Sequence, residues 1–120
     1  MSALEDQFLK LWQSKFPDLV LVREFSDVET WEADFQERYA KTKRSKRYRA
    51  DFAHLPSRCL IEIQGGTFNR GRHVTGSGYE RDARKFNLAT MGGWKVFLLT
   101  SQTAKDAAWH EMIAAALRNA

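Results

Sequence analysis

Two strand-like stretches near the middle of the chain, residues 47–54 and 58–64, are separated only by a short turn at Pro56-Ser57. A connection this short joins antiparallel neighbours, so the two stretches predict a β-hairpin. Centring the hairpin on that dipeptide sets its register, and apolar side chains then meet in two pairs, Phe52 with Ile61 and Ala50 with Ile63. We expect this face in the core, because a slip of one residue would turn it toward solvent.

The opposite face of the hairpin carries acids. In the same register Asp51 lies directly across from Glu62, with Gln64 two residues further along that face. Two carboxylates opposed across a ladder repel each other, so a fold that keeps them needs something that offsets the repulsion. A nearby Arg or Lys, a shared proton and a hard divalent cation each do so. The simplest alternative to a metal site is an ion pair with Arg49 or Arg72.

The rest of the chain alternates helix-like and strand-like stretches. Helical spacing of apolar residues predicts helices, and Val- and Leu-rich runs predict strands. The helices are expected over 2–16, 27–42, 79–91 and 102–118, the strands over 19–25 and 94–100, and a glycine-rich loop over 65–78. No linker divides the chain, so residues 1–120 are expected to form a single α/β domain with a mixed sheet flanked by helices.

Composition excludes several classes of protein. Hydrophobic residues make up 43% of the chain, which is enough for a core and argues against disorder. The single cysteine forms no internal disulfide, and the acidic start and short apolar runs predict neither a signal peptide nor a membrane span, so we expect a cytoplasmic protein. One cysteine and three histidines do not make a usual structural zinc site, and the glycines do not form a P-loop.

Positive charge is concentrated in one part of the chain. The net charge of +4 divides into a balance of +8 over residues 41–85 and of −4 over the remainder. Six of the nine residues from Lys41 to Arg49 are basic. Such a run is either a solvated face or a surface that binds a polyanion, most often nucleic acid.

The acids of the hairpin belong to a longer string of residues. Asp51, separated by ten residues from Glu62-Ile63-Gln64, resembles the PD-(D/E)XK nuclease signature. The wider string resembles the very-short-patch-repair-like branch of that superfamily, which includes small endonuclease domains of phages and bacteria. That string consists of Tyr48-Arg49-Ala50-Asp51-Phe52, Leu60-Ile61-Glu62-Ile63-Gln64-Gly65-Gly66, Gly71-Arg72-His73, Gly78-Tyr79-Glu80-Arg81-Asp82, Lys85 and Gly93-Trp94-Lys95-Val96. The resemblance implies a restriction-endonuclease-like αβββαβ core, with an inserted helical segment near 27–42.

The resemblance also implies a metal-dependent DNA endonuclease that hydrolyses phosphodiester bonds. Asp51 and Glu62 would bind Mg²⁺, for which Mn²⁺ could substitute, and the carbonyl of Ile63 would add a third ligand. Glu5 in the first helix would reach the metal through water, and Glu24 is a weaker candidate of the same kind. The alternative for Glu5 is a helix N-terminal acid that the helix dipole stabilises.

One position departs from the family pattern. Gln64 stands where the signature usually has Lys, and a Gln can orient a water but cannot supply charge. In this branch of the superfamily, histidines after the acidic strand act as general acid or base, which implies that role for His73. The alternative to an enzyme is a nucleic-acid-binding module on a degenerate nuclease fold, in which Gln64 marks the loss of activity.

The expected partner is DNA. The basic side chains expected to contact it are Lys43, Arg44, Lys46, Arg47, Arg49, Arg70, Arg72 and Lys85. Lys85 alternatively pairs with Asp82 in the same helix. Repair, junction-resolving and homing substrates all suit such a core. A single chain carries one active centre, so cutting both strands of a duplex would call for a homodimer.

Overall fold

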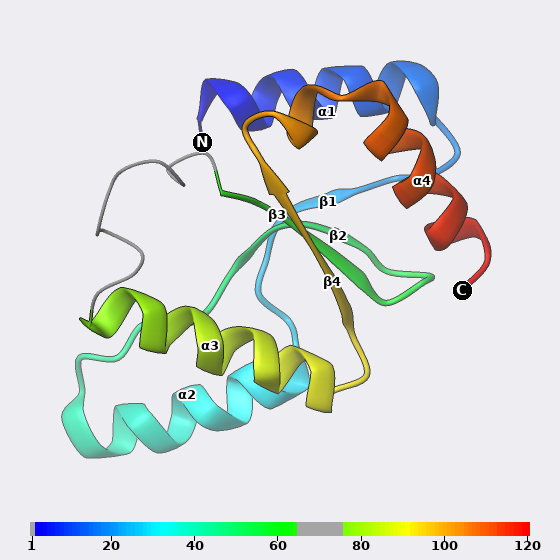
Figure 1. Ribbon diagram of the computed structural model, residues 1–120. Helices are drawn as coiled ribbons and strands as arrows, with labels where there is room; N and C mark the ends of the chain where they lie inside the picture. Colours follow the sequence, from blue (N-terminus) through cyan, green and yellow to red (C-terminus); the bar gives the residue numbers. More distant parts are fainter. Residues whose placement is uncertain (1, 65–75) are drawn as a thin grey trace.

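The computed structural model describes residues 2–64 and 76–120, which form a four-stranded mixed sheet between two layers of helices (Figure 1). The strands, in the order in which they lie side by side, are β1 (Val22–Phe25), β2 (Ala50–His54), β3 (Cys59–Gln64) and β4 (Lys95–Thr100). β2 pairs antiparallel with both β1 and β3, whereas β3 and β4 run parallel. Parallel neighbours need a crossover, and a helix lies in the connection from β3 to β4.

Helices from the two ends of the chain cover one face of the sheet (Figure 1). They are α1 (Ala3–Lys15), the short 3₁₀ helix η1 (Thr103–Lys105) and α4 (Ala107–Arg118). Side-chain oxygens cap both α-helices, because Ser2 accepts from the amide of Glu5 at 3.1 Å and Asp106 accepts from the amide of Ala108 at 2.8 Å. Buried aromatic residues of α1 and β2 dominate the core on this face.

The other face of the sheet is covered by α2 (Glu29–Thr42) and α3 (Gly76–Met91), which lie side by side (Figure 1). Trp31 joins the two helices, because its indole N–H donates to the backbone carbonyl of Lys85 at 2.8 Å. Its ring is buried in the second core cluster, between these helices and the sheet. In the sequence α2 lies between β1 and β2, which is the place where an inserted helical segment was predicted.

The predicted order of strands is confirmed, and the differences lie at the strand ends. The strand predicted over 19–25 begins at Val22, and the strand predicted over 47–54 begins at Ala50. These are the first residues that pair with a neighbouring strand. The residues just before β1, Leu19 to Leu21, are apolar but unpaired, and the residues just before β2, Arg47 to Arg49, are likewise unpaired, so both predicted strands are too long.

The helices also differ from the prediction at their ends. The helix predicted over 102–118 is divided into η1 and α4 at Asp106, whose side chain caps the second of them. α3 begins at Gly76, inside the loop predicted over 65–78. The part of that predicted loop from 65 to 75 lies outside the described residues.

The predicted hairpin register is confirmed, with Phe52 opposite Ile61 in the ladder of β2 and β3. Phe52, Ile61 and Ile63 share the core cluster on the side of α1 and α4, as expected. The expectation for Ala50 is wrong, because Ala50 is buried in the cluster on the opposite face. Here β2 pairs with β1, and Phe25, the partner of Ala50, packs against the same second cluster. Glu24, which precedes Phe25, has a left-handed φ of 51°.

Candidate active site where strands β2 and β3 separate

Asp51 and Glu62 lie where β2 and β3 separate. The paired positions of these two strands end at Phe52 and Ile61. Beyond them, the amide of Asp51 donates to Oε1 of Glu62 at 2.9 Å, and the amide of Ile63 donates to Oδ2 of Asp51 at 2.7 Å. Side-chain oxygens thus accept from the backbone of the opposite strand. This arrangement holds both carboxylates at the opening between the strands. The sequence predicted that the two acids lie across from each other, but in a continuous ladder.

The carboxyl group of Glu62 is buried, and that of Asp51 is half-buried. Glu62 is only 8% exposed, and burial is the main cause that raises its pKa, with the charge of Asp51 acting in the same direction. Burial also raises the pKa of Asp51, although the hydrogen bond from the Ile63 amide lowers it. Acids that are costly to ionise and that face each other are typical of functional sites.

A lysine from α3 reaches this acidic pair. Nζ of Lys85 lies 3.1 Å from Oε2 of Glu62, and each of the two side chains is 10% exposed. The ion pair therefore differs from both sequence-based alternatives, which joined Glu62 to Arg49 or Arg72 and Lys85 to Asp82. Sequence reasoning missed it because the contact depends on how α3 packs over the sheet.

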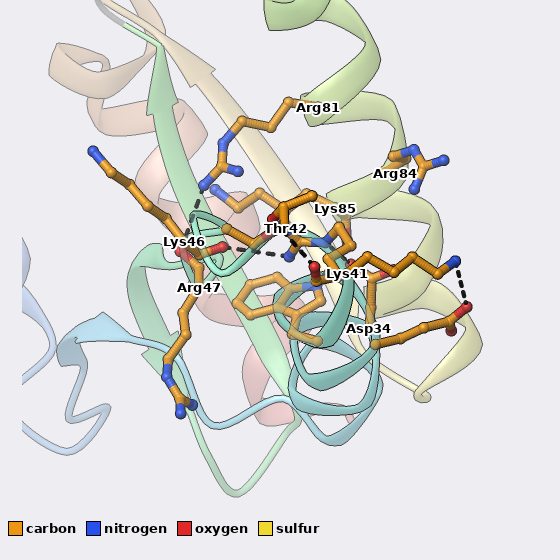
Figure 2. Close-up of polar contacts among 12 residues, drawn as sticks. Asp34, Lys41, Thr42, Lys46, Arg47, Arg81, Arg84 and Lys85 are labelled. Atoms are coloured by element: carbon orange, nitrogen blue, oxygen red, sulfur yellow. Dashed lines mark hydrogen bonds and ion pairs between the residues drawn. The ribbon is translucent and has the colours of Figure 1, made fainter.

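The acidic pair lines a hollow of about 590 Å³ that also has five basic side chains in its walls. Lys46, Arg47 and Arg49 come from the segment between α2 and β2, and Arg81 and Lys85 come from α3. Figure 2 shows Arg81 reaching from α3 to that segment, where its guanidinium donates to the carbonyl of Arg47 at 3.5 Å. Positive charge around a small acidic centre suits a phosphate-bearing chain.

Arg81 and Tyr48 are parts of the site for which the sequence suggested no role. Tyr48 is buried, and the guanidinium groups of Arg38 and Arg81 each lie 4.8 Å from the centre of its ring. Stacking on a ring fixes the orientation of a planar guanidinium. In the described part of the chain, neither Arg81 nor Lys46 forms an ion pair with a carboxylate, so both have charge to offer a ligand. The only sequence signal for a role of Arg81 and Tyr48 was their place in the motif string.

The other bases of the run are engaged with neighbouring side chains or exposed. Lys43 lies 5.3 Å from the centre of one aromatic ring of α2, and Arg47 lies 4.2 Å from another while pairing with an acid of that helix. Arg49 forms an ion pair of 3.5 Å with Glu24, and Arg44 is exposed. Acids of the preceding segment thus neutralise part of the charge that the count of bases suggested.

Two further predicted acids lie in the electrostatic surroundings of the pair. The charge of Asp51 adds to burial in raising the pKa of Glu5. Glu24 in turn contributes to the raised pKa of Asp51. Each of these acids has another partner, because Glu5 accepts from the hydroxyl of Ser2 at 3.2 Å and Glu24 pairs with Arg49. Both are therefore at the margin of the site.

The remaining predicted site residues are described in part. Gln64 is half-buried at the last position of β3, and the side chain of Ile63 belongs to the first core cluster. Three predicted residues belong to the range 65–75 and lie outside the described residues: Arg70, Arg72 and His73.

Oxygen donors for a divalent cation are present at the pair. The carboxylates of Asp51 and Glu62 are hard ligands of the kind that Mg²⁺ prefers, and the resemblance predicts the backbone carbonyl of Ile63 as a third. The hydrogen bond from the Ile63 amide goes to Oδ2 of Asp51. Residues 2–64 and 76–120 contain no group of three or more His, Cys, Asp or Glu side chains that could hold a metal. Two carboxylates and a carbonyl fit Mg²⁺, which usually retains several waters.

Comparison with known proteins adds no assignment. No family model, no curated protein and no solved structure matches the chain. Within the described residues, no helix has both the length and the apolar character needed to cross a bilayer. Any assignment of function therefore depends on the residues and geometry of the site itself.

Proposed function

We propose that the chain is a metal-dependent DNA endonuclease of the PD-(D/E)XK type. The observation that carries the proposal is the reciprocal hydrogen bonding of Asp51 and Glu62 at the opening between β2 and β3. It holds two desolvated carboxylates together in a hollow that five basic side chains also line. Such a pair opposes folding, because burial disfavours the ionised form of each acid. Its presence is best explained by chemistry that needs two acids.

The order of elements supports the same proposal. Without α2, the chain runs α1, β1, β2, β3, α3 and β4 around a mixed sheet, which matches the αβββαβ order implied by the resemblance. We propose a restriction-endonuclease-like core in which α2 is the inserted segment. Cleavage of both strands of a duplex would then require a homodimer.

The two acids would hold the cation. Asp51 and Glu62, together with the carbonyl of Ile63, would bind Mg²⁺, and Mn²⁺ is expected to substitute for it. When bound, the ion activates a water and neutralises charge that develops on the phosphate. Glu5 would contact the hydration shell of the ion from α1.

Other side chains would bind and orient the substrate. Arg81 and Lys46, which have no carboxylate partner in the described residues, would bind phosphate oxygens of a chain that lies in the hollow. Gln64 orients a water with its amide, and His73 donates or accepts a proton. Lys85 supplies positive charge from α3, at a site whose signature position is occupied by the neutral Gln64.

A cleavage assay with the full chain tests the proposal. Labelled linear, nicked, flapped and four-way DNA substrates are incubated with Mg²⁺, Mn²⁺ or EDTA. We expect cleavage of at least one substrate with either cation and none in EDTA. Asp51→Asn and Glu62→Gln keep an acceptor for the backbone amides but remove a charged ligand, so each should reduce the rate by about a hundredfold or more.

Glu111→Gln is the matched control for these variants. Glu111 is an exposed acid of α4 that pairs with Lys15 and does not line the hollow, so its substitution should leave the cleavage rate unchanged. A folded wild-type protein that cleaves none of the substrates with either cation would contradict the proposal.

A second candidate function is a non-catalytic nucleic-acid-binding module. The observation in its favour is the ion pair of Lys85 and Glu62, which neutralises one of the two acids without a metal ion. Salt-sensitive DNA binding without cleavage, at an affinity that neither Mg²⁺ nor Glu62→Gln changes, would favour this function over the nuclease.

A further inference from the structure

Both carboxylate oxygens of Glu62 have a positive or hydrogen-bonding partner. Oε1 accepts from the amide of Asp51 at 2.9 Å, and Oε2 lies 3.1 Å from Nζ of Lys85. Because each side chain of the ion pair is only 10% exposed, little water screens the two charges from each other. The ammonium group therefore occupies a position next to Oε2 that a cation bound by Glu62 would also need.

Contacts with two other residues hold Lys85 near Glu62. The backbone carbonyl of Lys85 accepts the indole N–H of Trp31 at 2.8 Å. Nζ of Lys85 lies 5.8 Å from the ring centre of Trp31 and 5.4 Å from that of Phe86, distances at which an ammonium is attracted to an aromatic face. Lys85 also lines the hollow that contains Lys46 and Arg81, so a small displacement would carry its charge toward a ligand there.

We propose that Lys85 and a divalent cation compete for Glu62. In the absence of the cation, Lys85 is the counter-ion of the acidic pair. Binding of the cation displaces the ammonium from Oε2, because two positive charges at one oxygen repel each other, and leaves Lys85 to contact a substrate phosphate in the hollow. This inference rests on the proposed function, since it assumes the cation that the nuclease would use.

Cation binding without DNA tests the competition directly. The affinity of the full chain for Mn²⁺ is measured by calorimetry for the wild type, Lys85→Met and Lys85→Arg. Lys85→Met removes the competing charge and should bind Mn²⁺ at least about tenfold more tightly than the wild type. Lys85→Arg keeps the charge and should not bind more tightly.

Lys46→Met is the matched control for charge in the hollow. Lys46 lines the same hollow, but in the described structure it makes no contact with Glu62. Its removal should change the Mn²⁺ affinity by less than about threefold, because an exposed charge is screened by water and salt. Lys85→Gln is a second neutral variant, used if Lys85→Met does not fold.

The rate of DNA cleavage is a second measurement on the same variants. Lys85→Met and Lys85→Gln should bind Mn²⁺ more tightly and yet cleave DNA about tenfold more slowly, because the phosphate loses a cationic partner. General damage to the site would weaken both properties, so opposite changes identify competition.

Two results overturn the inference in distinguishable ways. If the wild type binds Mn²⁺ and the folded neutral variants bind it equally or more weakly, Lys85 does not compete with the cation and the nuclease proposal is unaffected. If neither the wild type nor the variants bind Mn²⁺, the cation site is wrong, and the proposed function is overturned together with the competition.

Discussion

Asp51 and Glu62 each accept a hydrogen bond from a backbone amide of the strand that carries the other acid. The amide of Asp51 donates to Glu62 at 2.9 Å, and the amide that follows Glu62 donates to Asp51 at 2.7 Å. Each of the two acids therefore has two roles. It accepts a hydrogen bond from the backbone, and it places a desolvated negative charge at the site. Amide substitutions separate these roles, because Asn and Gln retain an acceptor oxygen and lose the charge.

Asp51→Asn is expected to stabilise the protein at neutral pH when no divalent cation is present. Burial raises the pKa of Asp51 in the folded state above its ordinary value of 3.8, so the folded state binds the proton more tightly than the unfolded state. Stability from this group is therefore present below pH 3.8 and is lost as pH rises through the folded pKa. Removing the charge should raise Tm at pH 7 by several degrees, for a gain of about 1 kcal/mol.

Thermal unfolding followed by circular dichroism checks this expectation. The difference in Tm between Asp51→Asn and the wild type should shrink as pH falls toward the ordinary pKa of Asp. Millimolar Mg²⁺ should raise the Tm of the wild type more than that of the variant, because a ligand of the folded state stabilises it. A lower Tm for the variant at pH 7 without cation would contradict the argument.

Neutralising the basic run should flatten the salt dependence of DNA binding. If these four bases contact phosphates, they contribute a slope of about −3.6 to the fall of log affinity against log salt, and the quadruple variant Lys43→Gln, Arg44→Gln, Lys46→Gln and Arg47→Gln should have a flatter slope. Lys46→Gln alone should reduce it by about 0.9, because Lys46 lines the hollow. Fluorescence anisotropy across a salt series measures the slope. An unchanged slope in the quadruple variant would mean that the run is a solvated face.

Arg81→Lys should fail to replace Arg81. The guanidinium stacks on Tyr48 at 4.8 Å and donates to the carbonyl of Arg47, a combination that an ammonium cannot reproduce. Both Arg81→Lys and Arg81→Ala should weaken DNA binding by about tenfold. Arg58→Ala is the matched control, because Arg58 also stacks on an aromatic ring, that of Trp94, but does not line the hollow. Equal losses for Arg58→Ala and Arg81→Ala would remove Arg81 from the proposed interface.

Gly93→Ala should destabilise the fold by about 1 kcal/mol. Gly93 has φ at +83°, and the turn that it forms brings the chain from α3 into β4, with the amide of Trp94 donating to the carbonyl of Ala89 at 2.9 Å. Gly93→Asn should cost less than Gly93→Ala, because Asn tolerates the left-handed conformation better. Urea unfolding measures both, and an equal cost for the two would show that crowding rather than backbone conformation limits this position.

The register of the hairpin was predictable because local constraints set it. A short turn and one apolar face leave a single pairing, Phe52 with Ile61, and the opposition of Asp51 and Glu62 follows from it. The orientation of Ala50 was not predictable by the same reasoning. Ala50 pairs with Phe25 of β1 and lies beyond the last pair of β2 with β3, and the hairpin sequence does not contain β1.

The basic part of the site was predictable as charge but not as contacts. Lys85 meets Glu62 only because α3 packs over the sheet beside α2. Arg81 stacks on Tyr48 for the same reason, although the sequence suggested no role for either residue. Periodicity predicts which stretches are helices, but it does not show which side chain of a helix reaches a distant strand.

The fluorescence of Trp31 is expected to report on the position of the Lys85 ammonium. Its indole N–H donates to the carbonyl of Lys85, and its ring centre lies 5.8 Å from the ammonium of the same residue. Since indole emission depends on nearby charge, any displacement of that ammonium would alter the light that Trp31 emits. α2 thus places an indole beside the ion pair of Lys85 and Glu62, so a binding event that displaced the ammonium would change the fluorescence of the unlabelled protein.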